Sequence, residues 1–202
     1  MLIEARNLSF SYGKEEVFKG LNFAINESFK AVICGENGSG KSTFLSILAG
    51  LLNPSVGEVV RRRNLKIAYL FQNSFDQFIA PSVLEDVAFS LLADKVGAKD
   101  AKKQALNMLE LLEISHLANR SIYYLSGGEK RLVAIAGVLV RNADIYLLDE
   151  PFNELDDNKS KLALKGLYAT NKPFVIITHH KKDILNQNEQ RYIFTKNEIL
   201  RG

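Results

Sequence analysis

The segment at residues 35–42 reads G-E-N-G-S-G-K-S, and it constrains the fold more than any other part of the chain. An apolar run at residues 31–34 precedes it, and a helix-like segment at residues 43–49 follows it. A strand that delivers a glycine-rich loop to a helix start lets backbone N–H groups surround an anion at the positive end of the helix. The pattern predicts a nucleotide-phosphate site in which Lys41 reaches the β- and γ-phosphates and Ser42 holds a magnesium ion. The alternative is a glycine-rich turn with a solvated lysine, which requires no strand before it and no helix after it.

Composition and charge are those of an ordinary globular protein. The chain has 202 residues, of which 47% are hydrophobic, so it can bury a substantial core in one domain, with room for an inserted lobe. Its net charge of +3 is small. The tight basic cluster at residues 61–63 lies between two strand-like segments and is interpreted as a solvated hairpin rather than as a nucleic-acid surface. No nucleic-acid partner is therefore expected.

The sequence also indicates a compartment. The first residues lack the basic start and long apolar stretch of a signal peptide, and no run of about 18 apolar residues could cross a bilayer. The single cysteine, Cys34, excludes an internal disulfide and agrees with a reducing environment. We expect a cytosolic chain that does not itself span a membrane.

The hydrophobic pattern changes along the chain from strands to helices and back. Strand-like segments occupy most of residues 1–35 and recur at residues 57–60 and 65–71. Helical periodicity extends from about residue 82 to residue 141. The β pattern then returns in short apolar runs, at residues 145–148, 174–177, 192–194 and 198–200.

Buried strands separated by helices predict a mostly parallel sheet with ligands at the carboxyl ends of its strands. Residues 145–148 are too apolar for a half-solvated strand and fit one that is buried on both faces. We expect an α/β fold in which a helical lobe is inserted into the α/β core. The expected single domain is residues 1–202, with the core at about 1–72 and 142–202 and the helical subdomain at 73–141.

Two carboxylates follow the buried strand at residues 145–148, at the sheet edge where a magnesium nucleotide would lie. A charge there is costly without a cation. Asp149 suits a magnesium ligand, and Glu150 suits a base that positions the attacking water. The alternative is an acidic surface turn, which the nearby phosphate loop disfavours.

A second candidate anion site lies at residues 125–129, L-S-G-G-E, which open a predicted helix. Ser126 and Glu129 have the spacing of a capping box. Capping alone does not explain Gly127 and Gly128, because glycine destabilises a helix turn by roughly 1 kcal/mol unless something must approach its backbone. The exposed N–H groups of this helix start can bind an anion.

These motifs together resemble the nucleotide-binding subunit of an ATP-binding-cassette (ABC) transporter, over nearly the whole chain and in the family's order. The resemblance implies an α/β fold with a P-loop NTPase core and a mostly parallel sheet, an N-terminal antiparallel β subdomain and an inserted α-helical subdomain. The matches outside the phosphate loop are Tyr12 for the aromatic that stacks on adenine, Gln72 for the Q-loop, residues 125–129 for the signature, Asp149 and Glu150 for the Walker B aspartate and catalytic glutamate, Asp156 for the D-loop and His179 for the switch histidine. The residues that match the Walker A loop are Gly35, Glu36, Asn37, Gly38, Ser39, Gly40, Lys41, Ser42 and Thr43.

Some positions depart from the family pattern. Asn153 and Glu154 replace the small residues usual before the Leu-Asp pair of the D-loop, which affects the expected contact with a second subunit. His180 is ambiguous, since adjacent histidines at a strand end point in opposite directions, and His179 is preferred because it follows the apolar strand and Thr178. The last residues close a strand pair, so no appended regulatory domain is expected.

Within the family, the residues after Gln72 are similar to those of energy-coupling-factor ATPases, which power uptake of vitamins such as biotin or of cobalt and nickel ions. The usual proline after Phe-Gln-Asn is Ser74 here. The alternative is that Phe75, Phe78 and Ile79 only fill the core of the helical lobe.

The resemblance implies ATP hydrolysis by a water that Glu150 positions, with magnesium held by Ser42, Gln72 and Asp149. Lys41 and His179 would offset charge on the transferred phosphoryl group. Signature residues Ser126, Gly127, Gly128 and Glu129 would face the ATP of a second subunit, either a copy or a paralogue, with Asp156 at the same contact.

The implied partners are integral membrane subunits of a transporter, and the implied location is the cytoplasmic face of the membrane. The alternatives are a soluble ABC ATPase acting on DNA or ribosomes and a small-molecule kinase. The kinase would leave the signature and His179 without roles.

Overall fold

The computed structural model describes residues 1–179 and 189–202, and the prediction about His180 falls outside these ranges. A six-stranded sheet with the order β5-β6-β7-β3-β8-β9 forms its centre. Strands β5, β6, β7, β3 and β8 are parallel, and β9 is antiparallel to β8. The strands are β3 (Lys30–Cys34), β5 (Ile67–Leu70), β6 (Ile145–Asp149), β7 (Phe174–Thr178), β8 (Gln190–Phe194) and β9 (Ile199–Arg201).

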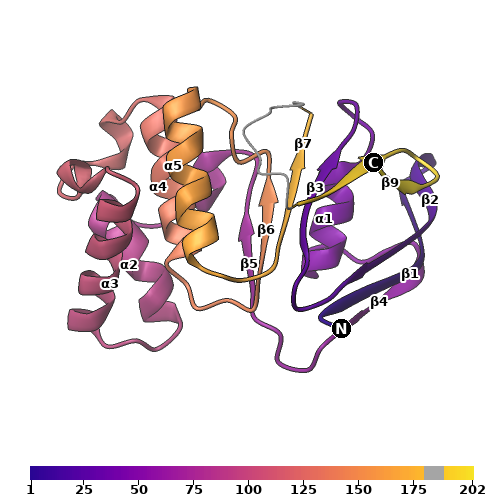
Figure 1. Ribbon diagram of the computed structural model, residues 1–202, viewed down its shortest axis with the longest axis horizontal. Coiled ribbons are helices and arrows are strands. Elements are labelled where there is room, and N and C mark those ends of the chain that lie inside the picture. The colour runs from indigo at the N-terminus through magenta and orange to yellow at the C-terminus, as the bar shows by residue number, and fades with distance from the viewer. Residues whose placement is uncertain (180–188) are drawn as a thin grey trace.

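The central strands are buried on both faces, as their apolar runs predict. Every residue of β6 and β7 is buried. Successive side chains alternate between two cores, so that Leu148 packs with one set of helices and Leu147 with the opposite layer. Helices α4 (Gly127–Leu139) and α5 (Asp157–Ala169) lie on one side of these strands and α1 (Lys41–Ala49) on the other (Figure 1).

A second, antiparallel sheet lies beyond α1. Its strands are β1 (Ile3–Tyr12), β2 (Glu15–Ile25) and β4 (Val56–Arg61), in the order β2-β1-β4. Aromatic rings fill the space between this sheet and α1, and the ring centroids of Phe18 and Phe44 are 6.0 Å apart. The sheet therefore fixes the position of the helix that starts at the phosphate loop.

The predicted hairpin at residues 61–63 is wrong. Strand β4 pairs with β1, whereas β5 pairs with β6, so the two strands that flank the arginines belong to different sheets. Arg61 is also not fully solvated: its guanidinium donates to the carbonyl oxygens of Ile47 and Leu48 at the end of α1. It adds a side-chain donor to carbonyl groups of the last helical turn, where Ile47 O also accepts from Gly50 N.

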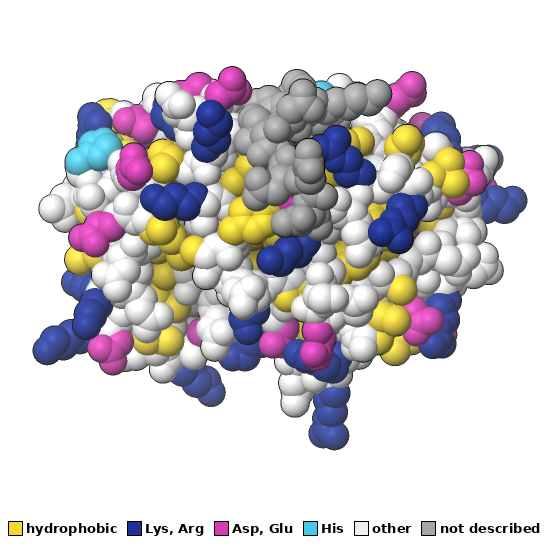
Figure 2. Space-filling view, viewed as in Figure 1, with side chains coloured by type: hydrophobic (Ala, Val, Ile, Leu, Met, Phe, Trp, Pro, Cys, Tyr) yellow, Lys and Arg dark blue, Asp and Glu magenta, His cyan; other side chains and the backbone are white. Residues whose placement is uncertain are grey.

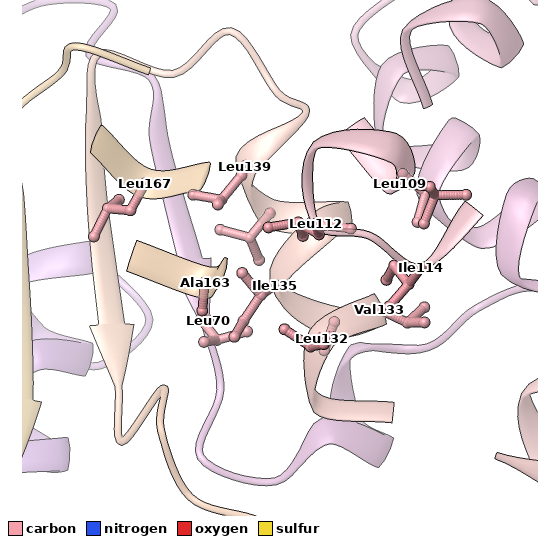
Figure 3. Close-up of a cluster of buried hydrophobic side chains, with 14 of the residues drawn as sticks. Leu70, Leu109, Leu112, Ile114, Leu132, Val133, Ile135, Leu139, Ala163 and Leu167 are labelled. Carbon is pink, nitrogen blue, oxygen red and sulfur yellow. The ribbon is translucent and has the colours of Figure 1, made fainter. Parts of the chain in front are cut away.

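Helices occupy most of the chain between β5 and β6. They are α2 (Val83–Ala93), α3 (Ala98–Leu111) and α4, with short 3₁₀ helices η1 (Ser74–Gln77), η2 (Ser115–Leu117) and η3 (Ile122–Tyr124). Figure 3 shows where they meet the sheet and α5, in a cluster whose labelled members are Leu70, Leu109, Leu112, Ile114, Leu132, Val133, Ile135, Leu139, Ala163 and Leu167. The helical segment thus shares one continuous core with a face of the sheet.

The predicted fold class is confirmed: a mostly parallel sheet, a separate antiparallel sheet and a group of helices between β5 and β6. Over the face shown in Figure 2, basic side chains are interspersed with acidic ones. Within residues 1–179 and 189–202, no helix is both long and apolar enough to cross a bilayer.

Candidate functional site

Most of the residues predicted to bind nucleotide meet at one cavity of about 500 Å³. It lies where β3, β5, β6 and β7 end, because the carboxyl ends of parallel strands meet at one edge of a sheet. Residues from the N-terminal sheet close the opposite wall. The lining residues are Tyr12, Glu15, Val17, Asn37, Gly38, Gly40, Lys41, Ser42, Thr43, Gln72, Glu150 and His179.

The phosphate loop connects β3 to α1 in a conformation that depends on glycine. Gly40 is the N-cap of α1 with a φ of 98°, and a Cβ at this position would lie 2.6 Å from Cγ1 of Val17. Both the left-handed backbone and the close packing exclude a side chain. The first turn of α1 holds no acidic residue, so the helix itself places no negative charge beside its free N–H groups.

Lys41 is buried and its ammonium group lies within the loop. Its Nζ donates to the carbonyl oxygens of Gly35, at 2.8 Å, and of Glu36, at 2.7 Å. Burial lowers the pKa of Lys41, and the charges of Glu150 and Asp149 partly oppose this effect. The ammonium therefore already lies beside the loop that would surround a phosphate.

Asp149 is 3% exposed, and its Oδ1 accepts a hydrogen bond from Ser42 Oγ at 3.1 Å. Burial raises the pKa of Asp149 to about 6, against the lowering effect of the Ser42 hydrogen bond. A hydroxyl and a carboxylate oxygen in contact are a donor set that suits magnesium, which needs few protein ligands beside water and phosphate oxygens. Gln72 lines the same cavity as Ser42, and it lines a neighbouring hollow together with Asp149.

Glu150, the predicted water-positioning residue, has a left-handed backbone. It has a φ of 47°, which costs a residue other than glycine roughly 1–3 kcal/mol unless its surroundings impose it. Its Oε1 lies 2.8 Å from Nδ1 of His179, at the end of β7. Among the described residues, the buried Oε2 has no hydrogen-bond partner. The contact with His179 thus involves one carboxylate oxygen, and the other has none of its hydrogen-bonding capacity used by the described residues.

Tyr12 lies at the end of β1 with 57% of its surface exposed, and its ring packs edge-on against Phe10 at 4.8 Å between centroids. Exposure of a ring at a cavity wall suits stacking on a base. Gly35, Glu36 and Ser39 line a neighbouring hollow on the other side of the loop, next to β8.

The signature residues lie outside this cavity. The predicted capping box is confirmed: Ser126 accepts from Glu129 N, and the Glu129 carboxylate accepts from Ser126 N at 2.7 Å. The D-loop of the same chain approaches the two glycines. A Cβ on Gly127 would lie 2.5 Å from Oε2 of Glu154, and one on Gly128 would lie 2.9 Å from the Glu154 carbonyl oxygen.

Asp156 also lies away from the cavity and has a local role. It is the N-cap of α5, and its Oδ1 accepts from Lys159 N at 2.8 Å. Any role at a contact with a second subunit remains a prediction.

Sequence reasoning missed Arg131 and Gln77. Arg131 is 1% exposed and donates to backbone carbonyls of both the Q-loop and the end of β6. The side chain of Gln77 hydrogen-bonds to the backbone at the end of β5: it accepts from Phe71 N and donates to Tyr69 O. In the sequence, Arg131 follows Lys130 in an apparently solvent-facing helix turn and gives no signal of burial.

Comparison with known proteins decides the family. The profile of the ABC transporter family matches residues 18–153, a segment that contains the phosphate loop, the signature and both carboxylates. The chain belongs to the ABC transporter family. Together with the described site, this membership makes it an ATP-binding ATPase of that family.

Several relatives of this ABC ATPase carry informative names. The energy-coupling factor transporter ATP-binding protein EcfA1 of Fusobacterium nucleatum is 36% identical, over 93% of this chain and 77% of its own. CbiO1 of Clostridium perfringens, a part of the ABC transporter complex CbiONQ, has a TM-score of 0.82 at 29% identity, over 100% of this chain and 88% of its own. The ATP-binding cassette MJ0796, in a dimeric post-hydrolysis structure with ADP and phosphate, has a TM-score of 0.87 at 28% identity, over 98% of this chain and 96% of its own.

Proposed function

We propose that this ABC ATPase powers an energy-coupling-factor importer, with cobalt, nickel or a vitamin such as biotin as the cargo. Two observations support the importer type. The chain is 36% identical to an energy-coupling-factor ATPase and similar in fold to a subunit of a CbiONQ complex. The residues after Gln72 also have the energy-coupling-factor pattern noted in the sequence.

The hydrolytic mechanism rests on one observation, the meeting of Glu150, His179, Lys41 and the Ser42–Asp149 pair at a single sheet edge. Glu150 positions the attacking water in line with the γ-phosphate through the oxygen that His179 does not contact. Lys41 exchanges its loop carbonyls for phosphate oxygens, and with His179 it offsets the charge on the transferred group.

The nucleotide is held from both ends. Tyr12 stacks on the base, and the loop residues from Gly35 to Thr43 bind the phosphates through backbone N–H groups. Ser42, Asp149 and Gln72 would hold a magnesium ion, which would neutralise negative charge on the phosphates when bound.

The signature lies outside the cavity, which favours a role at the ATP of a second subunit. Two chains that each offer one loop and one signature can meet head to tail about a two-fold axis. The second subunit is either another copy or a paralogous ATPase, and Asp156 lies at the same contact.

The dimer is tested by sedimentation with a non-hydrolysable ATP analogue and magnesium. Wild-type protein is expected to dimerise, whereas Ser126→Asp stays monomeric with ATP binding intact, because it places a negative charge at an anion site. Ser115→Asp, at the start of a different short helix, is the matched control and should dimerise. A wild-type monomer would contradict the homodimer and favour the paralogous pair.

Docking on a membrane protein accounts for large apolar side chains exposed beside the Q-loop. Ile79 is 68% exposed, Tyr123 76% and Tyr124 82%. The segments that carry them are adjacent, since Ile122 N donates to Pro81 O at 3.0 Å. We propose that residues 73–141 act as a helical subdomain that docks there on an integral membrane subunit, with the ATPase on the cytoplasmic face.

Docking is tested by tagging the chain in its native cell and identifying what co-purifies from gently solubilised membranes. Integral transporter subunits and a bound metal ion or vitamin are expected with the wild type and lost with Ile79→Glu. Leu51→Glu, at an apolar side chain that is 52% exposed elsewhere, is the control that should retain them. Recovery only from the soluble fraction, with ribosomes or DNA, would contradict transport and favour the soluble ATPase.

A further inference from the structure

A buried guanidinium joins the Q-loop to the turn that carries Glu150. Arg131 projects from the second turn of α4 and is 1% exposed. Its Nη1 donates to the carbonyl oxygens of Phe71, at 2.7 Å, and Gln72, at 3.1 Å. Its Nη2 donates to those of Asp149 and Glu150, each at 2.7 Å.

Two further acceptors complete the arrangement: Pro151 O lies 3.1 Å from Nε, and Ser74 Oγ lies 3.4 Å from Nη1. Within the described part of the chain, the hydrogen-bond acceptors of Arg131 are thus five carbonyl oxygens and a hydroxyl. These bonds occupy all five N–H groups of a guanidinium. Burial lowers the pKa of Arg131 to about 10, so the group stays protonated at neutral pH.

The turn that Arg131 contacts is the one that carries Glu150. Glu150 adopts a left-handed backbone, with a φ of 47°. Its N–H donates to Ile177 O at 3.0 Å, and its carbonyl accepts from Arg131. The turn is therefore held on one side by β7 and on the other by Arg131, and the same guanidinium holds the Q-loop beside it.

We propose that Arg131 is a positioning residue, which fixes the turn that aims the Glu150 carboxylate and makes the Q-loop and this turn move as one unit. The proposal rests on the proposed role of Glu150 in hydrolysis. A displacement of the Q-loop by a docked partner reaches Glu150 through a single side chain. A surface arginine with a solvated head could not do this, because its bonds would exchange with water.

The test compares Arg131→Lys and Arg131→Gln with matched changes at Arg61, which also donates to two backbone carbonyls but at the far end of α1. Arg131→Gln is expected to lower kcat about 100-fold, as misplacement of a catalytic group does, while the Kd for ATP changes by less than about threefold. Arg131→Lys should lie between this variant and the wild type. Arg61→Gln should lower the thermal unfolding temperature with kcat unchanged.

A second measurement separates positioning from general destabilisation. In a Glu150→Gln background, Arg131→Gln should change the residual kcat by less than about twofold, because residues that act through one group are not additive. A further loss of about tenfold or more there would overturn the proposal. A folded Arg131→Gln protein with wild-type kcat would also overturn it, as would equal losses in kcat and ATP affinity.

The proposed function fails separately, if Glu150→Gln alone leaves kcat intact. If the Arg131 variants do not fold, Ser74→Val provides a second test. This substitution removes a hydroxyl acceptor of Arg131 and places a larger side chain beside its Nη1. It is expected to lower kcat without weakening ATP binding. Unchanged kcat in this variant would overturn the proposal.

Discussion

Replacing Asp149 with asparagine is expected to stabilise the nucleotide-free protein while abolishing hydrolysis. The carboxylate is 3% exposed at the end of β6, and its Ser42 partner is a neutral hydroxyl. Asparagine has nearly the same shape, and its carbonyl oxygen can still accept the hydrogen bond from Ser42. The substitution therefore removes a buried negative charge and leaves the packing intact.

The magnitude follows from the pKa of Asp149, which burial raises from 3.8 to about 6. At about 1.4 kcal/mol for each pH unit, this corresponds to a penalty of up to ~3 kcal/mol for the ionised form. Between about pH 4 and pH 6 the folded protein holds a proton that the unfolded chain has released, so stability falls as pH rises through this window. Asp149→Asn should thus exceed the wild type by up to ~3 kcal/mol at pH 7.5 and match it below about pH 4.

The assay is urea unfolding followed by far-ultraviolet circular dichroism between pH 4 and pH 8. Asp144, just before the same strand, is a matched control, because its pKa is lowered whereas that of Asp149 is raised. The N–H of Lys66 and then Arg62 lower the pKa of Asp144, so Asp144→Asn should lose stability at neutral pH. The reasoning is refuted if Asp149→Asn is no more stable than the wild type at pH 7.5 and the two pH profiles run parallel.

The remaining predictions concern the capping box and the adenine contact. Ser126→Ala should lower the free energy of unfolding by about 1 kcal/mol at pH 7, seen as a fall of about 2–4 °C in Tm. The hydrogen bonds from the Ser126 backbone and then its hydroxyl lower the pKa of Glu129. The hydroxyl's part of this stabilisation is present above pH 4.5 and is lost as pH falls further, so the difference between Ser126→Ala and the wild type should shrink at low pH. Equal Tm differences at pH 7 and pH 3 would refute it. Tyr12→Ala should weaken ATP binding roughly tenfold by loss of stacking, with binding of inorganic triphosphate and the Tm unchanged. Equal weakening of both ligands in titration calorimetry would contradict stacking.

Local patterns predicted the parts of the molecule that depend on residues near in sequence. Three features follow from short stretches of sequence that need no distant residue to explain them. They are the phosphate loop, the buried strand before Asp149, and the capping box of Ser126 and Glu129. The alternation of buried strands with helices predicted the mostly parallel sheet, and the order of the motifs, through the family that they resemble, predicted the rest of the fold class.

Contacts between distant segments could not be predicted in this way. Arg131 bonds to carbonyls as far as 60 residues away, and nothing in its own helix indicates that its side chain is buried. Arg61 was assigned to a solvated hairpin because two strand-like segments flank it, and only the pairing of β4 with β1 reveals the error. The approach of Glu154 to Gly127 depends likewise on how two loops pack.

The central claim is that Glu150 positions the water that attacks ATP. The most direct measurement is the single-turnover rate of ATP hydrolysis by Glu150→Gln with magnesium present. The Kd for ATP is measured on the same variant. We expect ATP to bind within about threefold of the wild type and the hydrolysis rate to fall at least about 100-fold, the range over which general-base catalysis contributes. Hydrolysis at the wild-type rate with ATP bound would contradict the claim.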